Sequence, residues 1–208
     1  GKKKVLSDIT FQVKPGECVA IAGKNGCGKS TLMQIMAGIL KPDGGELCYF
    51  GKKAAYKSST FRRFCGYVPQ ENPLMEELTV QDNLKLWGGS HNANTKELVA
   101  QFQLEDLLQT EVSKLSGGMK RRLSIACALV ENPPFLLMDE PTTALDLYYK
   151  ESIHQWMKTY QQKNGIILMT THDESEIRNA DRCLFMDEGK VQELDAEDIL
   201  QKFAGMSE

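Results

Sequence analysis

Residues 23–30, GKNGCGKS, have the residue types and spacing of a phosphate-binding loop, GxxxxGK[ST]. Its glycines allow backbone N–H groups to turn towards phosphate oxygens, and a helix beginning at its end adds partial positive charge. Lys29 can reach the β- and γ-phosphates of a nucleotide, and the Ser30 hydroxyl can ligate Mg²⁺. The alternative, a Gly-rich turn with an exposed lysine, is disfavoured because an apolar strand precedes the loop and a helix follows it. The expected nucleotide contacts are Gly23, Asn25, Gly26, Cys27, Gly28, Lys29, Ser30 and Thr31.

A pair of adjacent acids follows the apolar run 135–138, FLLM. If that run is a buried parallel strand, Asp139 and Glu140 lie at its C-terminal edge, where open α/β sheets bind ligands. Asp139 then suits the coordination shell of Mg²⁺, and Glu140 suits the activation or orientation of an attacking water. Two acids in this position could instead form a solvated turn, but the phosphate loop elsewhere in the chain favours the site.

A second Gly-rich string, LSGGM at residues 115–119, precedes a run with the apolar spacing of a helix. Ser116 is a favoured N-cap residue, and Gly117 and Gly118 leave the backbone N–H groups uncovered. The result is a second helix N-terminus that can attract an anion, far in sequence from the phosphate loop. Taken alone, an ordinary capped helix start with flexible glycines is the better interpretation.

Strands and helices alternate in the first and last thirds of the chain. Strands are expected at 9–13, 18–22, 46–50, 64–68, 135–138, 166–170 and 183–186, and helices at 30–40, 147–163, 173–179 and the C-terminal end. Between them, residues 79–131 are mainly helical in pattern, beginning at a capping box, and residues 187–190 form a hairpin turn. This alternation predicts an α/β fold with a mostly parallel sheet and helices on both faces. We expect a single domain over 1–208, with a helical insertion at about 71–131.

Composition excludes several classes of protein. Charged residues make up 25% of the chain and the net charge is −3, so the basic excess of a dedicated nucleic-acid binder is missing. No apolar run is long enough to span a bilayer, and no signal peptide is visible. The six cysteines are scattered without metal-binding spacing, which favours reduced thiols in a cytosolic protein, and Cys27 is interpreted as a variable spacer of the loop.

In this order along the chain, the motifs resemble those of ABC-type ATPases. LSGGM resembles the signature sequence of that family, between the phosphate loop and the Asp-Glu pair. Gln70 matches the Q-loop, Ala144-Leu145-Asp146 matches the D-loop, and His172, after the apolar strand 166–169, matches the switch histidine. The resemblance covers nearly the whole chain. It implies a P-loop NTPase core, a small antiparallel β lobe and an inserted helical subdomain that carries the signature.

The resemblance also implies a mechanism. Two such domains pack head to tail, and each ATP lies between the phosphate loop of one chain and the signature residues of the other: Ser116, Gly117 and Gly118. Gln70 senses Mg²⁺ and the attacking water, and is therefore both a catalytic and a metal-site candidate. His172 holds the γ-phosphate and positions the water, and Asp146 couples the two sites.

The sequence departs from the common family pattern at two places. The aromatic residue that stacks on adenine would fall before Gly1. The signature continues as MKRRL, which resembles the bacterial branch that exports drugs and polysaccharides and whose members pair with a transmembrane permease. The implied location is cytoplasmic, on the inner face of the cell membrane. Two alternatives stay open: Lys120, Arg121 and Arg122 could be a solvated basic face, and the chain could be a soluble ABC ATPase that acts as a mechanical or assembly factor.

Overall fold

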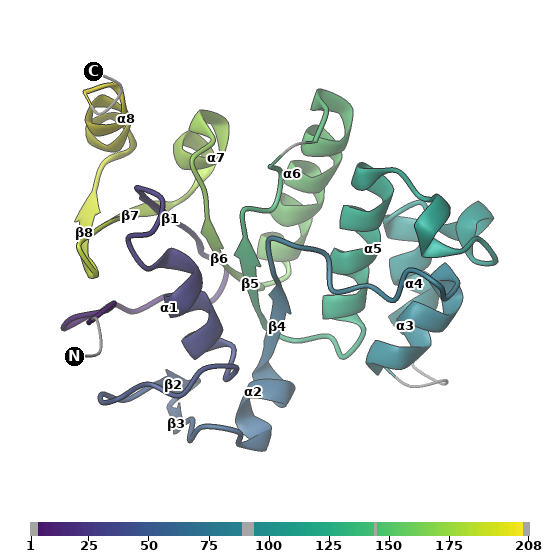
Figure 1. The fold of residues 1–208 in the computed structure, drawn as a ribbon, viewed down its shortest axis with the longest axis horizontal. Helices are drawn as coiled ribbons and strands as arrows, with labels where there is room; N and C mark the ends of the chain where they lie inside the picture. The colour runs from purple at the N-terminus through teal and green to yellow at the C-terminus, as the bar shows by residue number, and fades with distance from the viewer. Residues whose placement is uncertain (1–3, 89–93, 144, 206–208) are drawn as a thin grey trace.

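The computed structural model describes residues 4–88, 94–143 and 145–205 (Figure 1). Its main sheet has six strands in the order β4-β5-β6-β1-β7-β8. All neighbouring strands are parallel except β7 and β8, which form an antiparallel hairpin. This arrangement confirms the predicted α/β fold with a mostly parallel sheet. The strands are β1 Cys18–Gly23, β4 Cys65–Val68, β5 Phe135–Asp139, β6 Ile166–Thr170, β7 Arg182–Asp187 and β8 Lys190–Leu194.

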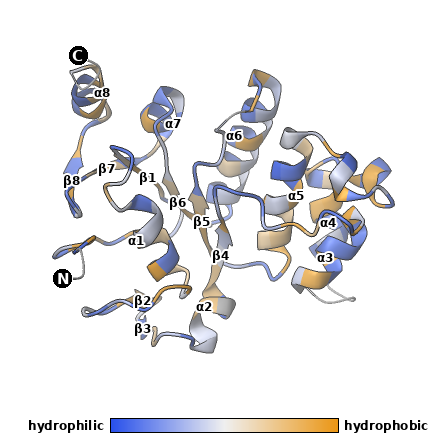
Figure 2. Cartoon of the chain, in the orientation of Figure 1, coloured by the Kyte–Doolittle hydropathy of each residue, from blue (hydrophilic) through white to orange (hydrophobic). Residues whose placement is uncertain are grey.

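Helices cover both faces of this sheet, and successive side chains of a strand point into the two cores on opposite faces. Val19 and Ile21 of β1 belong to the core that includes Met33 of α1, whereas Ala20 belongs to the opposite core, which includes Ile125 of α5. Burial on both faces explains why β1, β5 and β6 are continuous apolar runs, which Figure 2 colours towards its hydrophobic end. The covering helices are α1 Lys29–Met36, α5 Gly117–Leu129, α6 Leu147–Gln162, α7 Glu174–Asn179 and α8 Ala196–Ala204.

A helical region lies beside β4, on the far side of the sheet from β8 (Figure 1). It consists of α3 (Val80–Gly88), α4 (Asn94–Gln101), two 3₁₀ turns (Glu105–Leu107 and Val112–Lys114) and the N-terminal part of α5. The predicted helix start is confirmed, because Oγ1 of Thr79 accepts from the backbone N–H of Asp82 at 3.1 Å, as the cap residue of a capping box does. The Thr79 hydroxyl also donates to the Asp82 carboxylate at 2.7 Å. In the part of the chain that the structure describes, no helix is long and apolar enough to cross a membrane.

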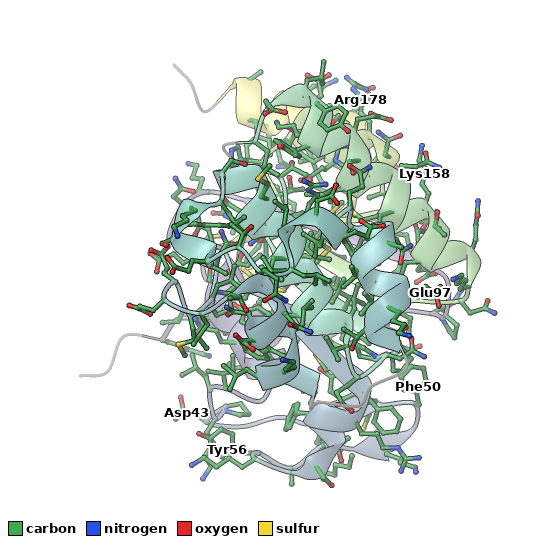
Figure 3. All side chains as sticks on the ribbon, turned by 90° about the vertical axis from the view of Figure 1, so that its right-hand side faces the viewer. Asp43, Phe50, Tyr56, Glu97, Lys158 and Arg178 are labelled. Carbon is green, nitrogen blue, oxygen red and sulfur yellow. The ribbon has the colours of Figure 1, made fainter. Side chains whose placement is uncertain are left out.

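A small antiparallel lobe lies below α1 and β4 in Figure 1. It contains β2 (Cys48–Tyr49), β3 (Lys52–Lys53) and α2 (Ser59–Phe64). Figure 3 shows Phe50 and Tyr56 in this lobe, opposite Arg178. The strand predicted at 46–50 is shorter than expected because Phe50 and Gly51 both have positive φ and form the turn to β3.

The strand predicted for residues 9–13 is wrong. This segment has no strand conformation, although Ile9, Phe11 and Val13 are partly buried against the core on the α1 face. Arg182 donates a hydrogen bond to the backbone oxygen of Gln12 at 2.8 Å, so a side chain, not a neighbouring strand, meets the backbone there. The alternation of apolar residues therefore reflects one buried face of this segment, not pairing with a neighbouring strand.

Candidate nucleotide site

The phosphate loop connects β1 to α1 at the carboxyl edge of the parallel strands. Gly26 (φ 76°) and Gly28 (φ 115°) have left-handed backbone conformations that favour glycine. A Cβ atom on Gly28 would also lie 2.8 Å from Cδ2 of Leu6, so a larger residue would have to displace that side chain. The backbone conformation therefore favours glycine at both positions, and at Gly28 the space around it does so as well.

Lys29, the first residue of α1, is enclosed by this loop. The side chain is buried, and its Nζ donates hydrogen bonds to the backbone oxygens of Gly23 at 2.7 Å and Lys24 at 3.1 Å. An ammonium group has three donors, and phosphate oxygens can accept from it at the start of the helix, where partial positive charge adds to the attraction. The loop thus holds the Lys29 ammonium group where it can bind an anion.

An open cavity of about 990 Å³ lies over the loop. This is the size of a small-molecule site, for which about 300–1,000 Å³ is usual. The cavity brings the loop together with the three residues predicted to act in catalysis, which come from distant parts of the sequence. The predicted residues that line it are Gly23, Asn25, Gly26, Gly28, Lys29, Ser30, Thr31, Gln70, Glu140 and His172.

The Glu140 carboxylate is the centre of the catalytic candidates. Its Oε2 accepts from Nε2 of Gln70 at 3.2 Å and from the hydroxyl of Thr143 at 3.0 Å. Nδ1 of His172 lies 3.6 Å from Oε1 of the same carboxylate. The Glu140 side chain is 11% exposed and that of His172 is 60% exposed, so the cluster has a protected carboxylate and an open side.

The backbone of Glu140 is held in an unusual conformation, with φ of 48°. Positive φ is uncommon for residues other than glycine and persists where the surroundings impose it. Here Thr170, the last residue of β6, supplies the constraint. The Glu140 N–H donates to the Thr170 backbone oxygen at 3.1 Å and to Oγ1 at 3.0 Å, and the same hydroxyl donates to the Asp139 carboxylate.

Asp139 fits the role predicted for it in a Mg²⁺ site. Its side chain is 3% exposed, and among the residues that the structure describes no lysine, arginine or histidine forms an ion pair with it. A buried carboxylate that forms no ion-pair contact suits a divalent cation with oxygen ligands. The hydroxyl of Ser30 and the amide oxygen of Gln70, both of which line the cavity, are the further oxygen ligands that the sequence suggested.

The other predicted contacts lie away from this cavity. The Ser116 hydroxyl accepts from the Met119 N–H at 3.3 Å, which confirms the N-cap of α5. Oδ1 of Asp146 accepts from the N–H of Tyr149 at 3.1 Å and caps α6. Ala144 of the predicted D-loop lies outside the described residues. The signature lies beside the first turn of α6, which Asp146 caps, since Gly118 packs directly on the ring of Tyr149.

That packing predicts different responses from the two signature glycines. A Cβ on Gly118 would come within 2.3 Å of the Tyr149 ring, whereas a Cβ on Gly117 would meet nothing within 4 Å. Gly118→Ala should therefore lower the free energy of unfolding by about 1–3 kcal/mol, the usual cost of overpacking. Gly117→Ala, at the first position of the helix, is the matched control and should not destabilise the fold. Urea denaturation of both variants measures the difference, and equal stabilities would contradict the contact.

Several residues of the site were not identified from the sequence. Thr143 and Thr170 bind Glu140 and Asp139, and the buried Glu176 accepts from the hydroxyls of Thr142 and Thr171. Threonines carry no spacing signal of their own, so only the fold reveals these contacts.

The solvated basic face is a wrong interpretation for Arg121 and Arg122, which are each 4% exposed. They belong to α5, a helix that packs against α3, α4 and β4 and is buried on most of its surface. The side chain of Lys120 is 20% exposed and forms an ion pair with Glu76 at 2.6 Å. The charged residue types suggested exposure to solvent. Arg121 and Arg122 are buried because α5 is enclosed by other elements.

A phosphate loop at the carboxyl edge of a parallel sheet places the chain among the P-loop nucleotide-binding proteins. The chain belongs to the ABC transporter family, because the family model described as "ABC transporter" matches residues 6–143. Within that family it corresponds to the ATP-binding domain.

The curated relatives agree with the exporter branch suggested by the signature. The chain is 35% identical over 215 residues to the Nod factor export ATP-binding protein I of Rhizobium etli, an alignment that covers 99% of this chain and 68% of that protein. Its identity to the protein of the same name from Paraburkholderia xenovorans is 37% over 199 residues, or 91% of this chain and 65% of that protein. The chain thus spans about two thirds of the length of these relatives.

Solved structures have the same fold. A dimeric ATP-binding cassette in a post-hydrolysis state with ADP and phosphate aligns with a TM-score of 0.83 and 30% identity, over 92% of this chain and 90% of that one. A bacterial Atm1-family ABC exporter with ATP bound aligns with a TM-score of 0.84 and 29% identity, over 98% of this chain and 38% of that one.

Proposed function

We propose that the chain is the ATP-hydrolysing subunit of a membrane exporter, with Lys29, Ser30 and Asp139 binding Mg-ATP. The observation that carries this proposal is the single cavity that joins the phosphate loop to the Glu140 cluster. Lys29 and the N-terminus of α1 bind the β- and γ-phosphates. Mg²⁺, when bound, offsets the charge of these phosphates.

In the proposed reaction, ATP and water give ADP and phosphate. The water oxygen forms a bond to the γ-phosphorus, the bond from this phosphorus to the β–γ bridging oxygen breaks, and ADP keeps the electron pair. Glu140 orients the water and accepts its proton, because its carboxylate is held over the loop by Gln70 and Thr143. His172, on the open side of the carboxylate, donates a hydrogen bond to the γ-phosphate as negative charge develops there.

The proposed active unit is a head-to-tail pair of ATP-binding domains. Ser116 and Gly117 are exposed and lie outside the cavity, as residues that act on the nucleotide of a second chain should be. Beside the exposed Asp146 are two large exposed apolar side chains, Leu147 at 81% and Tyr148 at 65%. Such a surface suits a protein interface. A similar cassette has been solved as a dimer with ADP and phosphate, which supports a pair of such domains as the active unit.

We further propose a transmembrane permease as the second partner, with the chain on the inner face of the cell membrane. Four large apolar side chains in the region that follows Gln70 are exposed and can receive such a partner. They are Met75, Leu78, Leu86 and Trp87. The relatives named for export favour this function over a mechanical or assembly factor.

The test is purification of the full-length protein from membranes of its own host in detergent. We expect it to co-purify with a polytopic membrane protein, and the complex to release phosphate from ATP in a reaction that EDTA stops. Recovery from the soluble fraction alone would overturn the transporter role, and a pure complex without phosphate release would overturn the ATPase role.

A further inference from the structure

The buried guanidinium of Arg121 lies directly behind the Glu140 cluster. Its Nε donates to the backbone oxygen of Pro141 at 2.8 Å, and Nη2 donates to the backbone oxygens of Asp139 at 2.9 Å and Glu140 at 3.1 Å. Three consecutive carbonyl groups, which span the strained backbone at Glu140, are therefore held by one side chain. Arginine suits this task because its donors form a rigid planar fork.

The other side of the same fork holds the Q-loop. Nη1 of Arg121 donates to the backbone oxygen of Pro69, and it lies 3.5 Å from that of Gln70. The side chains of Gln70 and Glu140 in turn meet at 3.2 Å on the cavity side. Two loops that are about 70 residues apart in the sequence are thus joined twice, once at their side chains and once at their backbones by Arg121.

Arg121 is carried by the helix that begins with the signature. It lies in α5, five residues after the N-cap Ser116, and this helix is buried on most of its surface. A close-packed helix moves as a body, so a shift at its N-terminus reaches the guanidinium. In the proposed dimer, the N-terminus of α5 contacts the nucleotide of the other chain, whereas Arg121 contacts the loops that act on the nucleotide of its own chain.

The environment of Arg121 is costly for a charged group. Burial lowers its pKa to about 10, although the nearby carboxylates of Asp139, Glu176 and Glu140 oppose this change. The group therefore stays charged at neutral pH. Among the described residues no carboxylate forms an ion pair with Arg121, and its guanidinium N–H groups donate to backbone oxygens instead. Deep burial with backbone partners alone suits a residue whose task is to fix loop geometry.

We propose that Arg121 is a positioning residue that couples the signature end of α5 to the placement of Glu140 and Gln70 in the same chain. Binding of ATP between two chains then aligns the hydrolytic carboxylate at both sites together. This inference rests on the proposed ATPase function. It gives the signature helix α5 a second role, because this helix also contacts the site at which its own chain hydrolyses ATP.

Arg122 supplies a matched comparison on the same helix. It is as buried as Arg121, but its Nη1 donates to the backbone oxygen of Phe102 at 3.0 Å and the side-chain oxygen of Gln103 at 3.2 Å, within the helical region. Its guanidinium also stacks on the ring of Tyr149. A change at Arg122 therefore tests the loss of a buried arginine that touches neither catalytic loop.

The experiment compares Arg121→Lys and Arg121→Gln with Arg122→Lys in the intact transporter complex. Binding of Mg-ATP, phosphate release and the Hill coefficient for ATP are measured for each. For both Arg121 variants we expect kcat to fall about 10- to 100-fold, because small displacements of reacting groups lower the rate by such factors. The dissociation constant of Mg-ATP should change little. The Hill coefficient should fall towards 1. Arg122→Lys should lose stability but keep the wild-type kcat and Hill coefficient.

Two outcomes would overturn the proposal. One is a normal kcat and Hill coefficient in a folded Arg121 variant. The other is loss of folding and of Mg-ATP binding in both Arg121 variants while Arg122→Lys stays folded, which would show a structural role only. Failure of the ATPase function itself is distinguishable, because the wild-type complex would then release no phosphate.

Discussion

Glu140→Gln is expected to lower the rate of ATP hydrolysis at least about 100-fold while the variant still binds Mg-ATP and self-associates with it. The carboxylate lines the same cavity as the phosphate loop and is the proposed general base, and removal of a positioned general base typically lowers a rate about 100- to 10,000-fold. Glutamine keeps the shape and can still accept the hydrogen bonds of Gln70 and Thr143, so the cavity should persist. Phosphate release and size-exclusion chromatography with ATP measure the two properties.

The control for this variant is Glu151→Gln, which removes one exposed carboxylate from α6, outside the nucleotide cavity. It should hydrolyse ATP at the wild-type rate. Wild-type turnover by Glu140→Gln would refute the role given to the carboxylate. Loss of self-association together with turnover would instead place Glu140 in nucleotide binding.

The central strands β1, β5 and β6 were predictable because they are buried on both faces and appear as short apolar runs. Residues 18–22, 135–138 and 166–170 lie within observed strands for this reason. The strand at 9–13 was predicted from a different pattern, the alternation of apolar and polar residues, and that prediction is wrong. Alternating side chains there reflect contact with the core, and the sequence contains no signal that distinguishes contact from strand pairing.

The site was predictable where a motif fixes the chemistry. Lys29, Gln70, Glu140 and His172 could each be assigned to a strand end or loop, and a parallel sheet brings such ends to one edge. The supporting residues could not be found in this way. Thr170 holds Glu140 through a register between β5 and β6 that is set by the sheet. The burial of Arg121 depends on the packing of α5 against other helices. The polar residue types of α5 do not reveal this packing.

Lys29→Met is expected to weaken Mg-ATP binding about 10- to 100-fold. Hydrogen bonds to charged groups contribute about 1.5–3 kcal/mol, and each 1.4 kcal/mol is a factor of about ten in affinity. Methionine keeps the apolar stem but has no donors for phosphate or for the carbonyls of Gly23 and Lys24. Equilibrium titration with a fluorescent ATP analogue measures the change. Lys53→Met, on the small lobe and fully outside the cavity, removes the same charge and should bind as the wild type does.

Taken with Glu140→Gln, this variant separates the two halves of the cavity. At an ATP concentration that just saturates the wild type, Lys29→Met should lose ATP-dependent self-association as well as turnover, because little nucleotide is then bound between two chains. Glu140→Gln should lose turnover alone. If Lys29→Met still associated with ATP as the wild type does, the phosphate loop would not supply the nucleotide that joins the chains. The exposed surface at Leu147 and Tyr148 would then have to hold the dimer together without it.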